Sequence, residues 1–433
     1  MRAGYPALFC PALKRLSRSG TKCRPETAKC TWPSSCSKSG MNAPFPHDRL
    51  ASLAGSRQPR NVLLLAQSFQ APYRVMRCAA ATGAKVFLFC NDEARSLAFS
   101  RFCAGYQDFT FDPEPSPDAA AAQIEAFCCV HKIDMILPAD AIAVRLLART
   151  RHLLTTPVFP IPDLATFDQL VTKDRFMEFC RANNIRHPEG HILANREALI
   201  AAIKNGCIRL PSILKPINRW GSVGVVKIDE SNALEIASKI DYAPILVQDY
   251  IEGVDRSISI FARKGAITKQ VTYCYPNNEF TFQREPELAR IVGEISADLK
   301  LDGVYNFDAR IEEDGTVWLL ECNPRFFFTM DAAMVAGANF AKIENVRCGS
   351  SHYSRLEAGP DGPIITVADG QLRQPEALVK HLLRGNLPNA MDAKMLAHWL
   401  RDPAYFMLAV AGYKRRWNSP VLERLFLGRK RAS

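Results

Sequence analysis

The segment YNFDARIEEDGTVWLLECNPR, which begins at Tyr305, restricts the fold of this chain more than any other segment. Polar and apolar residues alternate with a period of two on both sides of the central EEDG, as in half-buried strands joined by a turn. We therefore predict an antiparallel hairpin. Glu321 and Asn323 point to one face of its second strand. Leu320 and Cys322 point to the opposite face.

The polar face of this hairpin carries groups that suit a cation and phosphate. Asp308, Glu321 and Asn323 supply two carboxylates and an amide oxygen, which are ligands for Mg²⁺ that bridges phosphate oxygens. Arg325 adds a planar guanidinium that binds phosphate or carboxylate. The alternative is an ordinary hairpin whose charged face is solvated. Residues 318–320 are too apolar for an exposed strand, and an acid within such a strand needs a partner, which favours a metal site.

Length and charge exclude several classes of protein. The 433 residues allow two or three domains with full cores. The net charge of +11 is concentrated at the ends, because residues 1–40 hold eight Lys and Arg against one Glu and residues 414–433 hold seven against one. The body is close to neutral, which removes the main support for nucleic-acid binding. No apolar run is long enough to cross a membrane.

The fourteen cysteines do not suggest a disulfide framework. Ten of them follow residue 40, in apolar segments such as VFLFC and AFCCV, which is typical of buried free thiols in the cytoplasm. We expect residues 1–55 to be a disordered or non-native leader, with Met41 as a candidate start and a transit peptide as the alternative.

The first part of the body is predicted to be α/β. Buried strand patterns at residues 61–69, 85–90 and 134–140 alternate with helical patterns, which indicates parallel βαβ units. The first strand is followed by AQSFQAPYR, which lacks G-x-G-x-x-G, so a dinucleotide site is not supported.

Further elements follow from the same patterns. We predict a helix over residues 163–184, then a strand, helix, strand, loop and strand over 192–228, strands at 245–253 and 256–265, a helix at 285–301 and a mostly helical, basic end at 375–433.

A second candidate site lies in SILKPINRWGSVG. Lys215 on the predicted strand is followed by a loop of small residues, Gly221, Ser222 and Gly224, whose backbone N–H groups can approach phosphate closely. The spacing differs from that of a P-loop, and a glycine-containing hairpin turn is the alternative. Lys173, taken alone, is a solvated lysine at a helix start.

The order of these segments resembles the ATP-grasp ligases over roughly residues 61–348. The E-x-N-P-R sequence is most similar to carbamoyl-phosphate-synthetase-like and biotin-carboxylase-like members and to related carboxylate-amine ligases. The resemblance implies an α/β chain with a Rossmann-like pre-ATP-grasp domain at 56–160, a two-subdomain α+β ATP-grasp fold at 161–350 with its lid at about 187–248, and a helical basic C-terminal region at 351–433.

The resemblance also implies roles for individual residues. Phosphate binding falls to Lys173 and Lys215 under a closing loop of Gly221, Ser222 and Gly224, adenine and ribose binding to Gln248, Asp249, Tyr250, Ile251 and Asp255, and binding of Mg²⁺ or Mn²⁺ to Asp308, Glu321 and Asn323. Arg325 would hold the acceptor phosphate or a substrate carboxylate, and it is the implied catalytic residue together with Lys215.

Several residues depart from the family pattern. Gln248 stands where the hinge often has Glu, and Asp255 where a longer Glu is usual. Arg219 and Trp220 occupy loop positions where small residues are common. The aromatic run that follows Arg325 predicts a bulky aromatic substrate pocket.

The activity that the resemblance implies is a cytoplasmic ligase that consumes ATP, activates a small-molecule carboxylate as an acyl phosphate and joins it to an amine. Two alternatives stay open: formation of carboxyphosphate from bicarbonate, and nucleotide binding without catalysis. A homodimer is a further option. The basic C-terminal segment is expected to cap the ligase body, with peripheral contact to an anionic membrane as the alternative.

Overall fold

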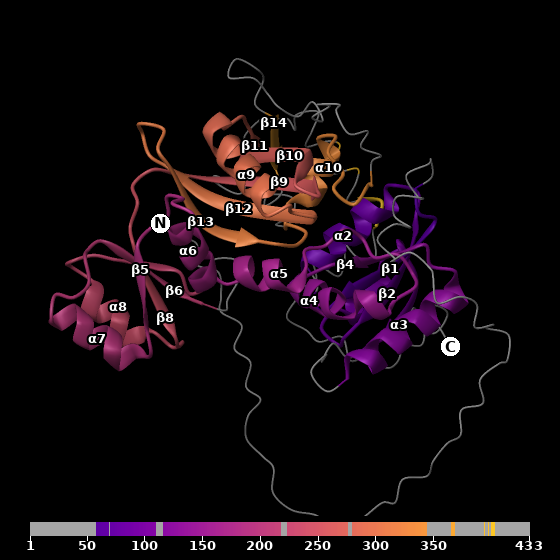
Figure 1. Ribbon diagram of the computed structural model, residues 1–433, viewed down its shortest axis with the longest axis horizontal. Helices are drawn as coiled ribbons and strands as arrows, with labels where there is room; N and C mark the ends of the chain where they lie inside the picture. Colours follow the sequence, from indigo (N-terminus) through magenta and orange to yellow (C-terminus); the bar gives the residue numbers. More distant parts are fainter. Residues whose placement is uncertain are drawn as a thin grey trace, which may run out of the picture.

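The computed structural model describes residues 58–68, 70–109, 116–217, 223–275, 279–343, 365–368, 394, 397 and 400–402. These residues form three β-sheets with flanking helices, a mixed α/β arrangement (Figure 1). The predicted leader, residues 219–222 of the glycine loop and most of the region after residue 350 lie outside the described residues. No helix in the described part is both long and apolar enough to cross a membrane.

The first sheet is parallel, with strand order β3-β2-β1-β4. Its strands are β1 (Asn61–Ala66), β2 (Lys85–Cys90), β3 (Cys103–Asp108) and β4 (Met135–Pro138), and its helices are α2 (Gln70–Ala80), α3 (Pro117–His131) and α4 (Ala141–Thr150). Leu63 and Leu64 of β1 belong to different cores on the two sides of the sheet, and both are fully buried. A strand covered on both faces is apolar throughout, which explains why it was predictable. The edge strand β3 lacks such a run and was not predicted.

The second sheet is small and antiparallel, with strand order β5-β8-β6-β7. It consists of β5 (Gly190–Leu193), β6 (Ser212–Pro216), β7 (Val226–Ile228) and β8 (Ile245–Asp249), with helices α7 (Arg196–Lys204) and α8 (Ala233–Lys239). Leu199, Leu214 and Val247 form part of its separate core. This unit projects from the rest of the molecule at the left of Figure 1.

The third sheet has six strands in the order β13-β12-β9-β10-β11-β14. They are β9 (Val254–Arg263), β10 (Ala266–Cys274), β11 (Glu279–Phe282), β12 (Gly303–Ile311), β13 (Val317–Asn323) and β14 (Ile365–Ala368), and helices α9 (Pro286–Asp298) and α10 (Met330–Val335) accompany them. Strands β12 and β13 pair antiparallel, which confirms the predicted hairpin.

A β-bulge corrects the predicted faces of β13. Asp308 lies opposite Glu321, but the next residue of β12, Ala309, lies opposite Leu319. Leu320 is therefore an extra residue, and it shifts the alternation by one position. Leu319 and Cys322 point into the core, whereas Leu320 is partly exposed, so the prediction that Leu320 shares a face with Cys322 was wrong.

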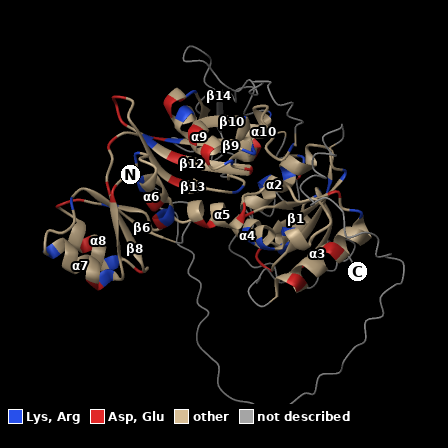
Figure 2. Cartoon of the chain, viewed as in Figure 1, with Lys and Arg blue, Asp and Glu red and all other residues tan. Residues whose placement is uncertain are grey.

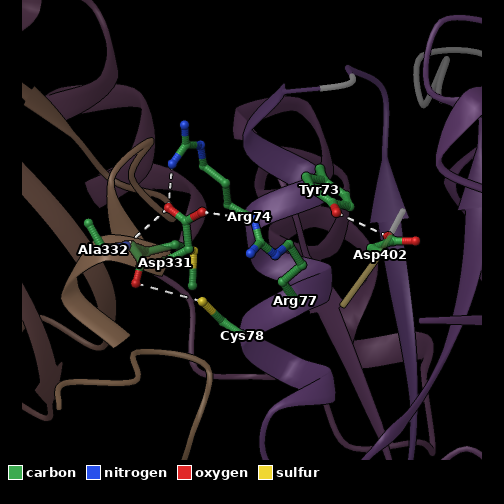
Figure 3. A network of polar contacts seen from close by, with 8 residues as sticks. Tyr73, Arg74, Arg77, Cys78, Asp331, Ala332 and Asp402 are labelled. Carbon is green, nitrogen blue, oxygen red and sulfur yellow. Dashed lines mark hydrogen bonds and ion pairs between the residues drawn. The ribbon is translucent and has the colours of Figure 1, made fainter. Parts of the chain in front are cut away.

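A buried polar cluster joins the parallel sheet to the region that follows the hairpin (Figure 3). We call Tyr73, Arg74, Arg77, Asp331 and Asp402 the joint cluster. The Asp331 carboxylate of α10 accepts from Arg74 of α2 and lies 3.4 Å from Arg77 Nη1. Asp402 accepts a hydrogen bond of 3.0 Å from the Tyr73 hydroxyl. All five side chains are almost fully buried, and the two arginines match the two acids in charge.

Charged side chains are otherwise mixed in sign over the described elements (Figure 2). This agrees with the nearly neutral body that the sequence indicates. Of the described cysteines, all of which are free, six are buried, whereas Cys129 and Cys207 are exposed. The prediction of buried free thiols therefore holds for most of these cysteines and was wrong for those two.

Candidate active site

The hairpin brings two carboxylates face to face. Asp308 of β12 and Glu321 of β13 are directly paired across the strands. Asp308 Oδ1 accepts hydrogen bonds from Ser257 Oγ at 2.6 Å and Asn306 Nδ2 at 3.0 Å. Burial and the nearby Glu321 charge raise the pKa of Asp308 from 3.8 to about 7. Like charges at this spacing oppose ionisation, and a cation between the two acids would reverse that effect.

Lys173 reaches this pair from a helix that the sequence predicted as part of a longer one. The predicted helix at residues 163–184 is two helices, α5 (Leu164–Val171) and α6 (Lys173–Ala182), separated by extended backbone at Thr172. The break places Lys173 in the first turn of α6. Its Nζ lies 3.3 Å from Glu321 Oε2, so this lysine is an ion-pair partner of the site and not a solvated side chain.

Lys215 approaches from the small sheet. It lies on β6 and is only 9% exposed. Desolvation lowers the pKa of Lys215 to about 8, and the Glu321 charge opposes that shift. Desolvation also disfavours the charged form of Glu321, but Lys173 and Lys215 hold the pKa of that carboxyl below its ordinary value. At neutral pH the site therefore contains two cations beside a charged Glu321.

Asn323 and Arg325 continue the polar face. Asn323 Nδ2 donates to Glu321 Oε1 at 3.2 Å, and Arg325 Nη2 donates to Asn323 Oδ1 at 2.9 Å. Burial lowers the pKa of Arg325, while Glu321, Asp308 and Asp140 act in the opposite direction. Asp140 lies just after β4, at the carboxyl end of the parallel sheet, and no sequence pattern indicated that it would approach Arg325.

The predicted hinge lies at the end of β8. Gln248 is buried, and its Nε2 donates to Pro188 O at 3.3 Å. Its Oε1 has no hydrogen-bond partner in the described part of the chain. Gly190 of β5 permits this packing, because a Cβ there would lie 2.8 Å from Gln248 Cγ. A buried acceptor without a donor suits a ligand amino group.

The backbone of the hinge already has partners. Asp249 N donates to Glu189 O at 2.9 Å and Tyr250 N donates to Pro211 O at 3.1 Å. Ile251 O accepts from Arg310 Nη1 at 3.0 Å. Adenine contacts at Tyr250 and Ile251 would therefore have to use other backbone groups, or share these.

Two cations near the hinge were missed from the sequence. Arg310 Nη2 lies 2.9 Å from Asp255 Oδ1, so the predicted ribose contact is already part of an ion pair. Lys227 Nζ lies 3.5 Å from the centroid of the Tyr250 ring. Arg310 could have been found, because it follows Asp308 by two residues and shares its face. Lys227 carries no such signal.

The glycine loop is described only at its end. Gly221 and Ser222 lie outside the described residues, as do Arg219 and Trp220. Gly224 has φ of +83°, which favours glycine, and its carbonyl accepts from Tyr242 Oη at 2.7 Å.

The aromatic run after Arg325 does not form a pocket of three rings. Phe326 and Phe327 are 2% exposed and belong to the core, where their rings lie 5.1 Å from Phe159 and 6.3 Å from Tyr273, respectively. Phe328 is partly exposed and lies against Arg74, whose guanidinium carbon is 4.1 Å from its ring centroid. The expectation of a bulky aromatic pocket was wrong for the two buried rings, because they fill the junction between sheets.

The acidic pair is a small donor set. Within the described residues, no group of three or more His, Cys, Asp and Glu side chains could hold a metal ion. Asp308, Glu321 and the amide of Asn323 form a mixed set of two carboxylates and one neutral oxygen. Such a set suits an ion that keeps several waters and binds phosphate oxygens.

Comparison with models of known protein families gives a match to part of this chain. Residues 241–357 match the family described as ATP-grasp in the biosynthetic pathway with Ter operon. No curated protein matches the sequence.

Three solved structures resemble this chain, one of them with a TM-score above 0.5. An N5-carboxyaminoimidazole ribonucleotide synthetase in complex with ADP has a TM-score of 0.53 and 13% identity, covering 75% of this chain and 85% of that one. The L-amino acid ligase from Bacillus licheniformis has a TM-score of 0.48 and 17% identity, covering 66% and 73%. The biotin carboxylase domain of the Hydrogenobacter thermophilus 2-oxoglutarate carboxylase has values of 0.49 and 17%, covering 67% and 71%. At 13% identity, the likeness to the synthetase concerns the fold alone.

Proposed function

This chain has the fold of the ATP-grasp superfamily, and on that premise we propose that it is an ATP-dependent ligase that joins a carboxylate to an amine. One observation carries the proposal: groups from three separate units meet at Glu321. Lys173 comes from α6, Lys215 from the small sheet and Asp308 from the large sheet. Cations on one side and a metal-binding acid pair on the other suit the transfer of a phosphoryl group.

We place the nucleotide between the small and the large sheet. Gln248 Oε1 is a buried acceptor that an adenine amino group would satisfy. Lys227 and Arg310 lie over the ring of Tyr250, two residues further along the chain. Lys173 and Lys215 would bind the phosphates. The predicted phosphate contacts of Gly221 and Ser222 stay a prediction, because these residues lie outside the described part of the chain.

We propose that Asp308, Glu321 and Asn323 hold Mg²⁺, with Mn²⁺ as the other candidate. The residues fit such an ion, because Asp308 and Glu321 face each other and the pKa of Asp308 is raised to about 7. When bound, the ion would neutralise charge on the phosphate oxygens.

In the proposed reaction, a carboxylate oxygen attacks the γ-phosphorus, the bond to the β,γ-bridging oxygen breaks and ADP leaves. The amine nitrogen then attacks the acyl carbon, the carbon–oxygen bond to phosphate breaks, and the nitrogen loses a proton to water. Lys173 and Lys215 would stabilise charge on the moving phosphoryl group. Arg325 would orient the carboxylate, since its guanidinium is held by Asn323 and Phe326 O.

Hydroxylamine trapping tests the proposal. The full-length protein is incubated with ATP, Mg²⁺, hydroxylamine and a panel of organic acids, and both ADP and hydroxamate are measured. A ligase releases ADP with at least one acid and yields the matching hydroxamate. ADP release stimulated by bicarbonate alone would point instead to carboxyphosphate formation. Nucleotide binding without ADP release across the panel would refute the ligase and favour a binding protein.

A further inference from the structure

A row of polar side chains crosses the large sheet from the acidic pair towards its far strands. Ser257 of β9 lies opposite both Tyr273 of β10 and Asp308 of β12. Ser259, two residues along the same face of β9, lies opposite Asn306. The row therefore extends from Glu321 into a part of the sheet where Ser259 is fully buried and Asn306 and Tyr273 are only 6% exposed.

The hydrogen bonds in this row define how the Asn306 amide is oriented. Tyr273 Oη and Ser259 Oγ lie 3.0 and 2.8 Å from Asn306 Oδ1, and Asn306 Nδ2 lies 3.0 Å from Asp308 Oδ1. The ionised form of Asp308, which is the form that binds a cation, is only an acceptor, so it requires the NH₂ group on its side. The amide oxygen must then face the two hydroxyl groups, which donate to it.

This arrangement determines which oxygen of Asp308 is left to interact with Glu321 and with a cation. Ser257 Oγ and Asn306 Nδ2 both donate to Oδ1. Oδ2 is the oxygen left to share an ion with Glu321, which is directly opposite. Side chains that hold a metal ligand in this way often influence affinity as strongly as a weak ligand does.

We propose that Asn306 is a positioning residue for the cation site, oriented by Tyr273 and Ser259, and that it sets the rotation of the Asp308 carboxylate. This inference rests on the proposed function. The polar row also contacts a segment beyond the two acids, because the Tyr273 ring stacks on Phe327, two residues after Arg325. The row thus connects the cation site to the segment that carries the proposed substrate-binding guanidinium.

The test is binding of Mn²⁺, followed by electron paramagnetic resonance, to the full-length protein with and without ATP. Asn306→Ala should weaken Mn²⁺ binding about 10- to 100-fold. Tyr273→Phe, which removes only a hydroxyl group, should weaken it less but in the same direction. In turnover assays, both variants should raise the KM for Mg²⁺ more than they lower kcat at saturating Mg²⁺.

Tyr305→Phe is the matched control. Tyr305 is also buried on β12, but its hydroxyl donates to Asp302 O at 3.2 Å, away from the acidic pair. This variant should bind Mn²⁺ as the wild type does. If Asn306→Ala fails to fold, Tyr273→Phe and Ser259→Ala decide the question.

Two negative results have different meanings. Folded Asn306→Ala and Tyr273→Phe that bind Mn²⁺ with wild-type affinity would overturn the role of Asn306 alone. A wild-type protein that binds no Mn²⁺ in either condition would overturn the metal assignment of the proposed function itself.

Discussion

The molecule contains two clusters of charged side chains, one fully buried and one partly buried, that differ in how their charges meet. In the joint cluster, the Asp331 carboxylate lies between two guanidiniums. In the acidic pair of the hairpin, Asp308 faces Glu321 directly. The first cluster places opposite charges in contact, whereas the second places two acids opposite each other, of which Glu321 forms an ion pair with Lys173.

This difference separates a structural role from a functional one. Buried opposite charges that pair with each other stabilise one fixed packing, although apolar residues in their place can give an equally stable protein. Buried like charges are costly and persist where a ligand or an ion completes them. Substitutions that neutralise one acid in each cluster should therefore have opposite effects on stability.

The largest effect is expected at the joint. Asp331→Asn should lower the free energy of unfolding by about 3–5 kcal/mol, because two buried guanidiniums lose their carboxylate. Urea denaturation measures this change. Asp302→Asn is the control, since the ion pair of Asp302 with Arg263 at 2.8 Å is partly exposed and should contribute about 1 kcal/mol or less. Equal losses in the two variants would contradict the distinction.

Removing a carboxylate from the acidic pair should affect turnover instead. Glu321→Gln is expected to lower ATP turnover about 10²- to 10³-fold, because the transferred phosphoryl group loses part of its preorganised surroundings. ADP release at saturating ATP measures the change. Glu235→Gln, on the exposed surface of α8, is the matched control and should retain full activity. A Glu321→Gln enzyme with normal turnover would remove this acid from the site.

The joint cluster and the acidic pair should differ most clearly in how they affect the stability of the metal-free protein. Asp308→Asn should raise the free energy of unfolding at pH 7 by on the order of 1–2 kcal/mol, after allowance for the partial exposure of this carboxyl. The gain comes from removing a charge that faces Glu321. Urea denaturation in the presence of a chelator tests it. A loss comparable to that of Asp331→Asn would show that the two clusters have the same role.

The same carboxyl should give a pH dependence of modest size. The folded pKa of Asp308 is about 7 against an ordinary 3.8, so the folded protein holds this proton more tightly than the unfolded chain does. Its contribution to stability is therefore complete below pH 4 and is lost as the pH rises through 7. Glu321, Lys173, Lys215 and Arg325 are charged groups that share this site.

The measurement is the difference in unfolding free energy between the wild type and Asp308→Asn from pH 4 to 8, without metal. The wild type should lose stability relative to the variant as the pH rises. A difference that stays constant across this range would contradict the raised pKa.

Local patterns were sufficient for the elements whose side chains face a core in a regular way. We could predict β1, β2 and β4 from their apolar runs and β12 and β13 from their alternation of polar and apolar residues. In each case the burial of one or both faces of the strand determines the pattern. The bulge at Leu320 could not be predicted, because it depends on how β13 pairs with β12 and has no signature in the local composition. Strand β10 was missed because Thr268, Lys269 and Gln270 interrupt its apolar pattern.

For the site, alternation alone was enough to place Asp308 and Glu321 near each other. It did not predict that Lys173 and Lys215 would both reach Glu321. Nor did it predict that Asn306, with Tyr273 behind it, would hydrogen-bond to Asp308. The resemblance to a known family supplied the two lysines as an expectation, but it supplied neither the joint cluster nor the polar row.

The sequence by itself therefore determined the strands and helices that have a regular apolar pattern and which strand carries the acids, because these depend on neighbours a few positions apart. The tertiary structure decided which charges meet. Arg74 and Asp331 are 257 positions apart, and Ser259 and Asn306 are 47 apart. Contacts between such distant residues depend on how the sheets pack, and no local period records that packing.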